Sequence, residues 1–96
     1  MNSEINGNAT VRPLVNLKGV IVPADWDEVG NYTAIALAAD DEQEYRISPD
    51  NQAGRSLHGL LRARVKIEGY IDPEAVEGYK KVIFINSYRI LGVAHS

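Results

Sequence analysis

The chain has 96 residues, a formal net charge of -3 at pH 7 and no cysteine. This length predicts one domain, and the absence of thiols excludes disulfides, cysteine nucleophiles and zinc–thiolate sites. The first residues lack the basic start and apolar stretch of a signal peptide, and no apolar run is long enough to span a membrane. We therefore expect a cytoplasmic protein without membrane association.

The amino-terminal third of the chain predicts a tail, a strand and a loop. Residues 1–12 are polar and predict a disordered tail that ends at Pro13. Apolar residues alternate along residues 14–24, which predicts a long first strand, and the central Gly19 indicates a bulge or sharp bend. The acidic segment 25–31 interrupts this pattern and predicts a loop.

Two further strands are predicted before the middle of the chain. The large residues of 32–39 alternate with a period of two, which favours a strand, although the many alanines make a helix the competing prediction. Residues 40–42 predict a tight turn, and residues 43–48 predict a third strand with Tyr45 pointing inward.

One short helix is predicted after the third strand. Ser48 is suited to cap this helix and Pro49 to occupy its first position. Four apolar residues share one helical face and are expected to pack on the core: Ala53, Leu57, Leu60 and Leu61.

The last part of the chain predicts two strands and a frayed end. Residues 62–71 alternate clearly between apolar and polar, and residues 80–91 form the last strand, with an acidic loop at 72–79 between them. Residues 92–96 are expected to fray. In the last strand, the residues predicted to share one face are Val82, Phe84, Tyr88 and Ile90.

The predicted order of elements is three strands, one helix and two strands, with a glycine inside the long first strand. The segments in which this pattern is clearest are 17–22, 65–71 and 81–90. On these features the chain resembles the oligonucleotide/oligosaccharide-binding (OB) fold family, and in layout small bacterial single-domain OB-fold proteins of unknown function. An SH3-like barrel is the alternative, but it gives the helix no natural place.

The resemblance implies an all-β fold: a five-stranded Greek-key OB-type barrel over residues 13–91, with one short helix between strands three and four. It also implies a binding face on the second and third strands, flanked by the loops at residues 25–31 and 72–79. Fold alone does not decide the ligand, because OB domains bind nucleic acids, oligosaccharides or proteins.

Acidic residues crowd the implied face. Ten of the 13 acids in the chain fall in or near its loops and strands: Asp25, Asp27, Glu28, Asp40, Asp41, Glu42, Glu44, Asp72, Glu74 and Glu77. A negative rim repels phosphates and removes the counterion release that drives nucleic-acid binding. The sequence therefore predicts a non-catalytic module that binds a protein or peptide partner. The candidate contact residues are Trp26, Tyr32, Arg46 and Tyr79.

Basic residues gather elsewhere, on the fourth and fifth strands. They suggest single-stranded nucleic-acid binding as the alternative function, or a stripe that only keeps a strand edge soluble. The residues of this stripe are Arg62, Arg64, Lys66, Lys80, Lys81 and Arg89.

No motif indicates catalysis, a metal or a cofactor. His58 and His95 are the only histidines, and neither has a neighbouring pattern that predicts a catalytic triad. The segment from Asp25 begins like a calcium-binding loop, but Val29 and Ala36 stand where that loop needs oxygen ligands. Phosphate-binding glycine motifs are absent. We therefore expect no enzyme activity, no bound metal and no cofactor.

Overall fold

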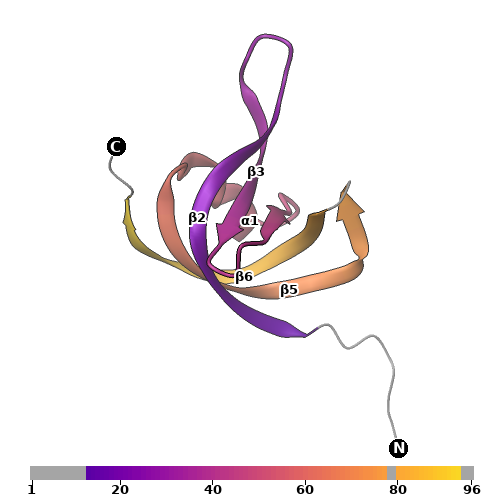
Figure 1. The fold of residues 1–96 in the computed structure, drawn as a ribbon, viewed down its shortest axis with the longest axis vertical. Coiled ribbons are helices and arrows are strands. Elements are labelled where there is room, and N and C mark those ends of the chain that lie inside the picture. The colour runs from indigo at the N-terminus through magenta and orange to yellow at the C-terminus, as the bar shows by residue number, and fades with distance from the viewer. Residues whose placement is uncertain (1–12, 78–79, 94–96) are drawn as a thin grey trace, which may run out of the picture.

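The computed structural model describes residues 13–77 and 80–93, with the backbone alone described at 72–77 and 80. The predicted tail of residues 1–12 lies outside the described residues. Five strands close into a barrel in the order β2-β3-β4-β6-β5 (Figure 1). Their bounds are β2 (Leu14–Trp26), β3 (Tyr32–Ala39), β4 (Glu44–Ile47), β5 (Ala63–Glu77) and β6 (Lys80–Val93).

The strand pairing confirms the predicted fold class. Neighbouring strands are antiparallel except β4 and β6, which run parallel and close the barrel. One short helical segment lies between β4 and β5. This closed five-stranded barrel, with its helix in the predicted place, is compatible with an OB-like fold.

The inward side chains of the barrel strands form the hydrophobic core. Alternate residues of β5 point inward as predicted, and the same period places residues of β2, β3 and β6 opposite them. Each fully buried aliphatic side chain contributes roughly 1.5–3 kcal/mol. The largest of these side chains are Ile21, Leu37, Leu57, Val65, Ile67, Ile83 and Ile85.

Gly19 allows a close approach between backbones. It pairs with Ala39 on one side and with Val65 on the other, so β2 joins both halves of the barrel there. A Cβ atom at this position would overlap the Ala38 carbonyl oxygen. The predicted bulge is not at Gly19: the register of β2 shifts later, between Pro23 and Asp25.

The helix begins later than predicted. α1 (Gln52–Ser56) is capped by Asn51, whose Oδ1 accepts a hydrogen bond of 2.9 Å from the Gly54 N–H. Ser48 does not cap it: the Ser48 Oγ accepts from the Asp50 N–H at 3.2 Å, before the helix begins, and the Ser48 N–H donates to the Ile83 carbonyl and continues the pairing with β6. The Asn51 Nδ2 also donates to the Ile85 carbonyl at 2.7 Å, which ties α1 to β6.

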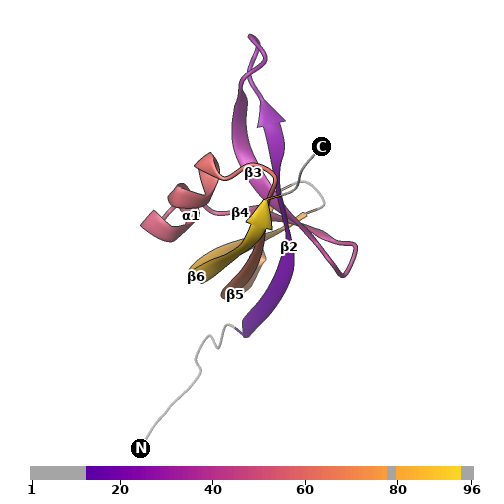
Figure 2. The ribbon, with the colours of Figure 1, turned by 90° about the vertical axis from the view of Figure 1, so that its left-hand side faces the viewer.

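A 3-10 turn, η1 (Leu57–Gly59), follows α1 directly. The four predicted apolar residues, from Ala53 to Leu61, pack in or against the core as predicted, but Leu60 and Leu61 lie beyond the end of the helical segment. Figure 2 shows the helical segment on one side of the barrel, beside β4 and β6. Among the described residues, no helix is long and apolar enough to cross a membrane.

The predicted face of the last strand is wrong because β6 contains a bulge. Glu68 pairs with Ser87 and Gly69 with Ile85, so Asn86 is an extra residue in β6. The bulge reverses the alternation: Tyr88 packs against the core, whereas Phe84 lies on the outer side. β6 also ends at Val93 instead of Leu91.

The predicted loop at residues 25–31 is confirmed at residues 27–31, whereas most of the loop predicted at residues 72–79 is strand. β2 continues to Trp26, which pairs with Tyr32, and only a turn at residues 27–31 separates β2 from β3. This hairpin projects beyond the barrel (Figure 1). β5 likewise extends to Glu77 and pairs irregularly with the start of β6.

Candidate functional site

A groove opens where β3 and β4 separate. The two strands pair only from Ala36 to Ala38 on the β3 side. On its other edge β4 pairs with β6 from Tyr45 to Ile47, where the strand ends. β3 instead continues beside β2 into the projecting hairpin. The gap between the diverging strands becomes a surface groove.

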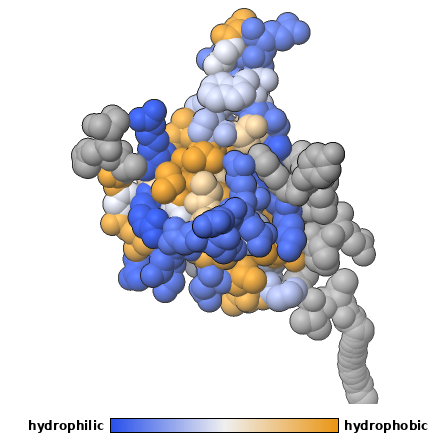
Figure 3. Space-filling view, in the orientation of Figure 1, coloured by the Kyte–Doolittle hydropathy of each residue, from blue (hydrophilic) through white to orange (hydrophobic). Residues whose placement is uncertain are grey.

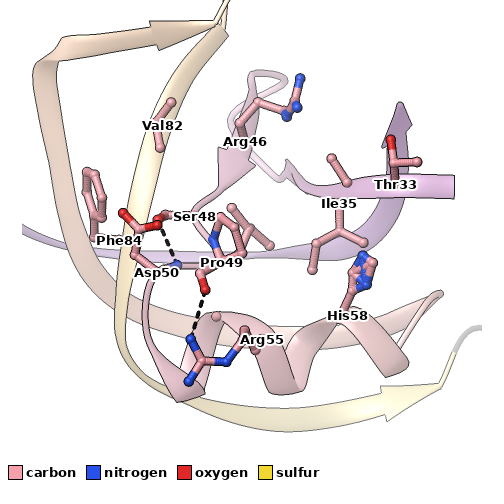
Figure 4. Close-up of a pocket in the computed structure, with 13 residues that line it drawn as sticks. Thr33, Ile35, Arg46, Ser48, Pro49, Asp50, Arg55, His58, Val82 and Phe84 are labelled. Atoms are coloured by element: carbon pink, nitrogen blue, oxygen red, sulfur yellow. Dashed lines mark hydrogen bonds between the residues drawn. The ribbon is translucent and has the colours of Figure 1, made fainter. Parts of the chain in front are cut away.

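The groove has a volume of about 870 Å³, within the range of small-ligand sites. Residues 33–35 of β3 form one wall, and α1, η1 and the segment 48–50 form the opposite side (Figure 4). β4 and β6 supply the remaining wall, where Val82 and Phe84 lie. The groove thus joins three parts of the fold that are distant in sequence.

The ionisable side chains of the groove nearly balance in charge. The Arg46 Nη2 donates to Asp25 Oδ2 at 2.6 Å, and the Arg46 side chain is only 14% exposed. Arg55 donates from Nη1 to the Pro49 carbonyl at 3.1 Å, beside Asp50. His58 adds an imidazole on the η1 side. Two arginines therefore face two aspartates around the groove.

Tyr32 and His58 hold the turn η1 against β3. The Tyr32 hydroxyl donates to the His58 carbonyl at 2.7 Å, and the two ring centroids lie 4.9 Å apart. The rings are tilted by 39°. This contact joins the helical wall to the hairpin strand and fixes the width of the groove at that end.

Small apolar residues lie under Arg46 on the outer side of the sheet. Ala36 and Val82 flank Arg46 in the strand register. Both are buried, yet neither belongs to the core cluster inside the barrel. The aliphatic part of Arg46 therefore lies over an apolar strip, and Phe84 adjoins it in the groove.

The structure brings together two of the four predicted contact residues. Arg46 lines the groove and Tyr32 closes one end of it. Trp26 is 60% exposed on the projecting hairpin, one strand away from the groove. Val29, at the tip of the same hairpin, is 81% exposed and forms a hydrophobic spot there (Figure 3). Tyr79 lies outside the described residues.

The acidic residues at the hairpin have local roles. Asp25 is paired with Arg46. Asp27 Oδ1 accepts from the N–H groups of Asn31 and Val29, at 2.9 and 3.0 Å. Hydrogen bonding to the backbone of Asn31 holds the pKa of Asp27 below its usual value. These carboxylates therefore shape the hairpin and its base.

The acids of the turn at residues 40–42 do not border the groove. β3 separates this turn from the projecting hairpin, so the two acidic segments lie at opposite ends of the strand. Asp40 binds Arg64 through two hydrogen bonds of 2.6 and 3.1 Å. Asp41 Oδ2 accepts from the Tyr45 hydroxyl at 2.7 Å, and this bond lowers the pKa of Asp41. The predicted acidic rim is thus divided.

The basic residues of the predicted stripe are also dispersed. Lys66 stands between Lys18 and Arg89 in the strand register, so these three cations form a row across β2, β5 and β6. Arg64 is engaged by Asp40. The other three predicted stripe residues lie outside this row: Arg62 precedes β5, and Lys80 and Lys81 begin β6.

Arg46 is the one predicted contact among the described residues that line the groove, and the missed lining residues include Arg55, His58 and Phe84. Phe84 was predicted to share a face with Tyr88, and the bulge at Asn86 that separates the two residues has no sequence signal. Arg55 and His58 lie on the helical segment, whose polar residues carried no signal of their own. Knowing that this segment lies beside β3 would have identified them.

Among the side chains that the structure describes, which exclude those of residues 72–80, no three His, Asp or Glu side chains come together as a metal site. Comparison with protein-family models, with curated proteins and with solved structures finds no match. The candidate function therefore depends on the groove and its surroundings.

Proposed function

We propose that the chain is a non-catalytic OB-type binding module that takes a protein segment or peptide into the groove between β3 and β4. The carrying observation is the divergence of these two strands, which opens a groove of about 870 Å³. It borders the strands that the OB resemblance implies as the binding face. We also propose that the chain belongs to the OB-fold family, that it is one of the small bacterial single-domain members, and that it is located in the cytoplasm.

Charge favours a peptide over a polynucleotide in this groove. Arg46 and Arg55 are offset by Asp25 and Asp50, so few counterions would be released on phosphate binding. Nucleic-acid grooves also present successive aromatic rings for base stacking. Phe84 and His58 are the rings in the described lining, and they come from different elements. A peptide needs neither feature.

The projecting hairpin offers a second contact area for the same partner. Trp26 is exposed, and tryptophan is among the residues most often found at binding hot spots. It pairs with Tyr32, which closes one end of the groove. A partner segment that leaves the groove at this end would meet the hairpin.

A peptide selection tests the proposal. The immobilised full chain is challenged with a displayed library of random peptides of about 12 residues, and enriched peptides are synthesised with a fluorescent label. We expect Arg55→Glu to weaken binding about tenfold. Arg89→Glu, which makes the same charge change outside the groove, should leave binding unchanged. Failure to enrich any peptide, or equal effects of both variants, would contradict the proposal.

Single-stranded nucleic-acid binding is the second candidate, because Lys18, Lys66 and Arg89 lie side by side on three adjacent strands. Glu68 lies beside this row and reduces its charge. The test is titration with a fluorescent oligothymidylate of about 20 nucleotides. Binding that weakens steeply with salt and is lost in Lys66→Glu would support this candidate; absence of binding at low salt would reject it.

A further inference from the structure

We infer that the groove binds its peptide by strand addition, with the peptide extended along the edge of β3 that β4 leaves at residues 33–35. This inference rests on the proposed peptide-binding function and specifies its mode. The peptide strand would occupy the position that β4 would hold if it continued beside β3.

The first support is the register of β3. On one edge β3 pairs with β2 from Tyr32 to Ala39. On the other edge the described pairing with β4 stops at Ala36. The Ala39 N–H donates to the Gln43 carbonyl across the β3–β4 turn. Because backbone groups alternate between the two edges, the backbone of Ile35 is used in the last pairing with β4, and the N–H and C=O of Thr33 point toward the edge beyond the end of β4.

The second support is the identity of the residues along the groove. Thr33, Ala34 and Ile35 are consecutive, and all three line it. Successive strand residues point to opposite faces, so a groove that touches three in a row runs along the edge of the strand. Figure 4 shows Thr33 and Ile35 on this wall, with the helical segment opposite.

The composition of this edge does not prevent pairing. Proteins usually protect exposed edges with proline or with charged side chains, especially lysine. Residues 33–35 contain neither. Strand addition to such an edge supplies affinity through main-chain hydrogen bonds, while neighbouring pockets select alternate side chains.

The charged and apolar residues of the groove indicate which side chains the peptide carries. Arg55 and His58 lie on the wall opposite β3, so an acidic side chain of the peptide would be favoured on that side. Val82 and Phe84 form an apolar surface at the β6 end, which favours an apolar side chain there. The predicted partner is therefore a short extended segment with an acidic and an apolar residue.

The test is a scan of backbone N-methylation along the synthetic peptide selected above. Each N-methyl group removes one N–H donor without changing the side chain. Strand addition predicts that binding falls about tenfold at alternate positions across three or four residues, and little at the positions between. Tolerance at every position, or losses spaced by three or four residues as in a helix, would overturn the inference while leaving peptide binding intact.

A charge exchange tests the orientation. We expect the selected peptides to carry an acidic residue, and its replacement by lysine to weaken binding to the native chain about tenfold. The lysine peptide should bind Arg55→Glu better than it binds the native chain. If the lysine peptide binds Arg55→Glu no better than it binds the native chain, the placement of the acidic residue beside Arg55 is wrong. If no peptide is selected at all, both the proposed function and this inference fail.

Discussion

The Arg46 guanidinium and the Asp25 carboxylate form an ion pair of 2.6 Å that crosses β3. Asp25 lies on β2 at the base of the projecting hairpin, and Arg46 lies on β4 at the wall of the groove. Ala36 of β3 stands beside Arg46 in the register. The pair thus joins the hairpin to the strand that turns away from it, and it sets one border of the groove.

Removal of this ion pair should loosen the base of the hairpin. We expect Asp25→Asn to lower the free energy of unfolding by roughly 1 kcal/mol, because Arg46 is largely buried while Asp25 is half exposed. Urea unfolding at low and high salt measures the change. Asp40→Asn is the control: both partners of its ion pair with Arg64 are well exposed, and it should cost less. A larger loss in the control would contradict the assigned role of Arg46 and Asp25.

Replacement of Gly54 by alanine should destabilise the protein, although alanine normally favours a helix by about 1 kcal/mol. The new Cβ would overlap the Ser48 carbonyl oxygen, which is held in place by the pairing of Ser48 with β6. We expect a loss of about 1–3 kcal/mol in thermal or urea unfolding. Gly59→Ala is the matched control, since its Cβ would meet nothing within 4 Å. Equal stability of the two variants would show that α1 does not lie this close to β4.

Tyr45 should make the protein sensitive to alkaline pH. Burial, and then the hydrogen bond to Asp41, raise the pKa of Tyr45 to about 12, above the value near 10 of an unfolded tyrosine. The folded state therefore holds this proton more tightly, and its contribution is complete below about pH 10 and is lost as the pH rises toward 12. Unfolding free energies measured from about pH 8 to pH 11 should stay level up to about pH 10 and then fall. Tyr45→Phe should flatten that fall; an unchanged slope would contradict the assignment.

Trp26 is the single tryptophan and provides a probe of the hairpin. Because its side chain is 60% exposed, its fluorescence should be strongly quenched by added acrylamide in the free protein. Binding of a selected peptide that extends beyond the groove should reduce this quenching. Peptides truncated at the end beside Tyr32 should still bind but should leave the quenching unchanged. Protection of Trp26 before any peptide is added would contradict an exposed hairpin.

The barrel could be predicted from the sequence because its strands follow a period of two. The alternation along β5 and the glycine in β2 indicated the OB-type barrel, and the apolar residues after Pro49 located the helical segment. Local irregularities could not be predicted in this way. The bulge at Asn86 depends on the pairing of β6 with β5, and it reversed the face of Phe84.

The groove was beyond prediction for a related reason. Its walls come from β3, β4, β6 and the helical segment, and its position depends on where the pairing of β4 with β3 ends. No local pattern marks that end. Tyr32 and Arg46 were predicted from the strands that carry them, whereas Arg55 and His58 needed the packing of η1 beside β3.

The most direct test of the groove is nuclear magnetic resonance mapping of backbone amides in the full chain during titration with a selected peptide. We expect the largest shift changes at residues 33–35, at Arg55 and at His58, together with slower amide exchange at Thr33 in the complex. Shift changes centred on Lys18, Lys66 and Arg89 instead, with residues 33–35 unaffected, would contradict a binding site between β3 and β4.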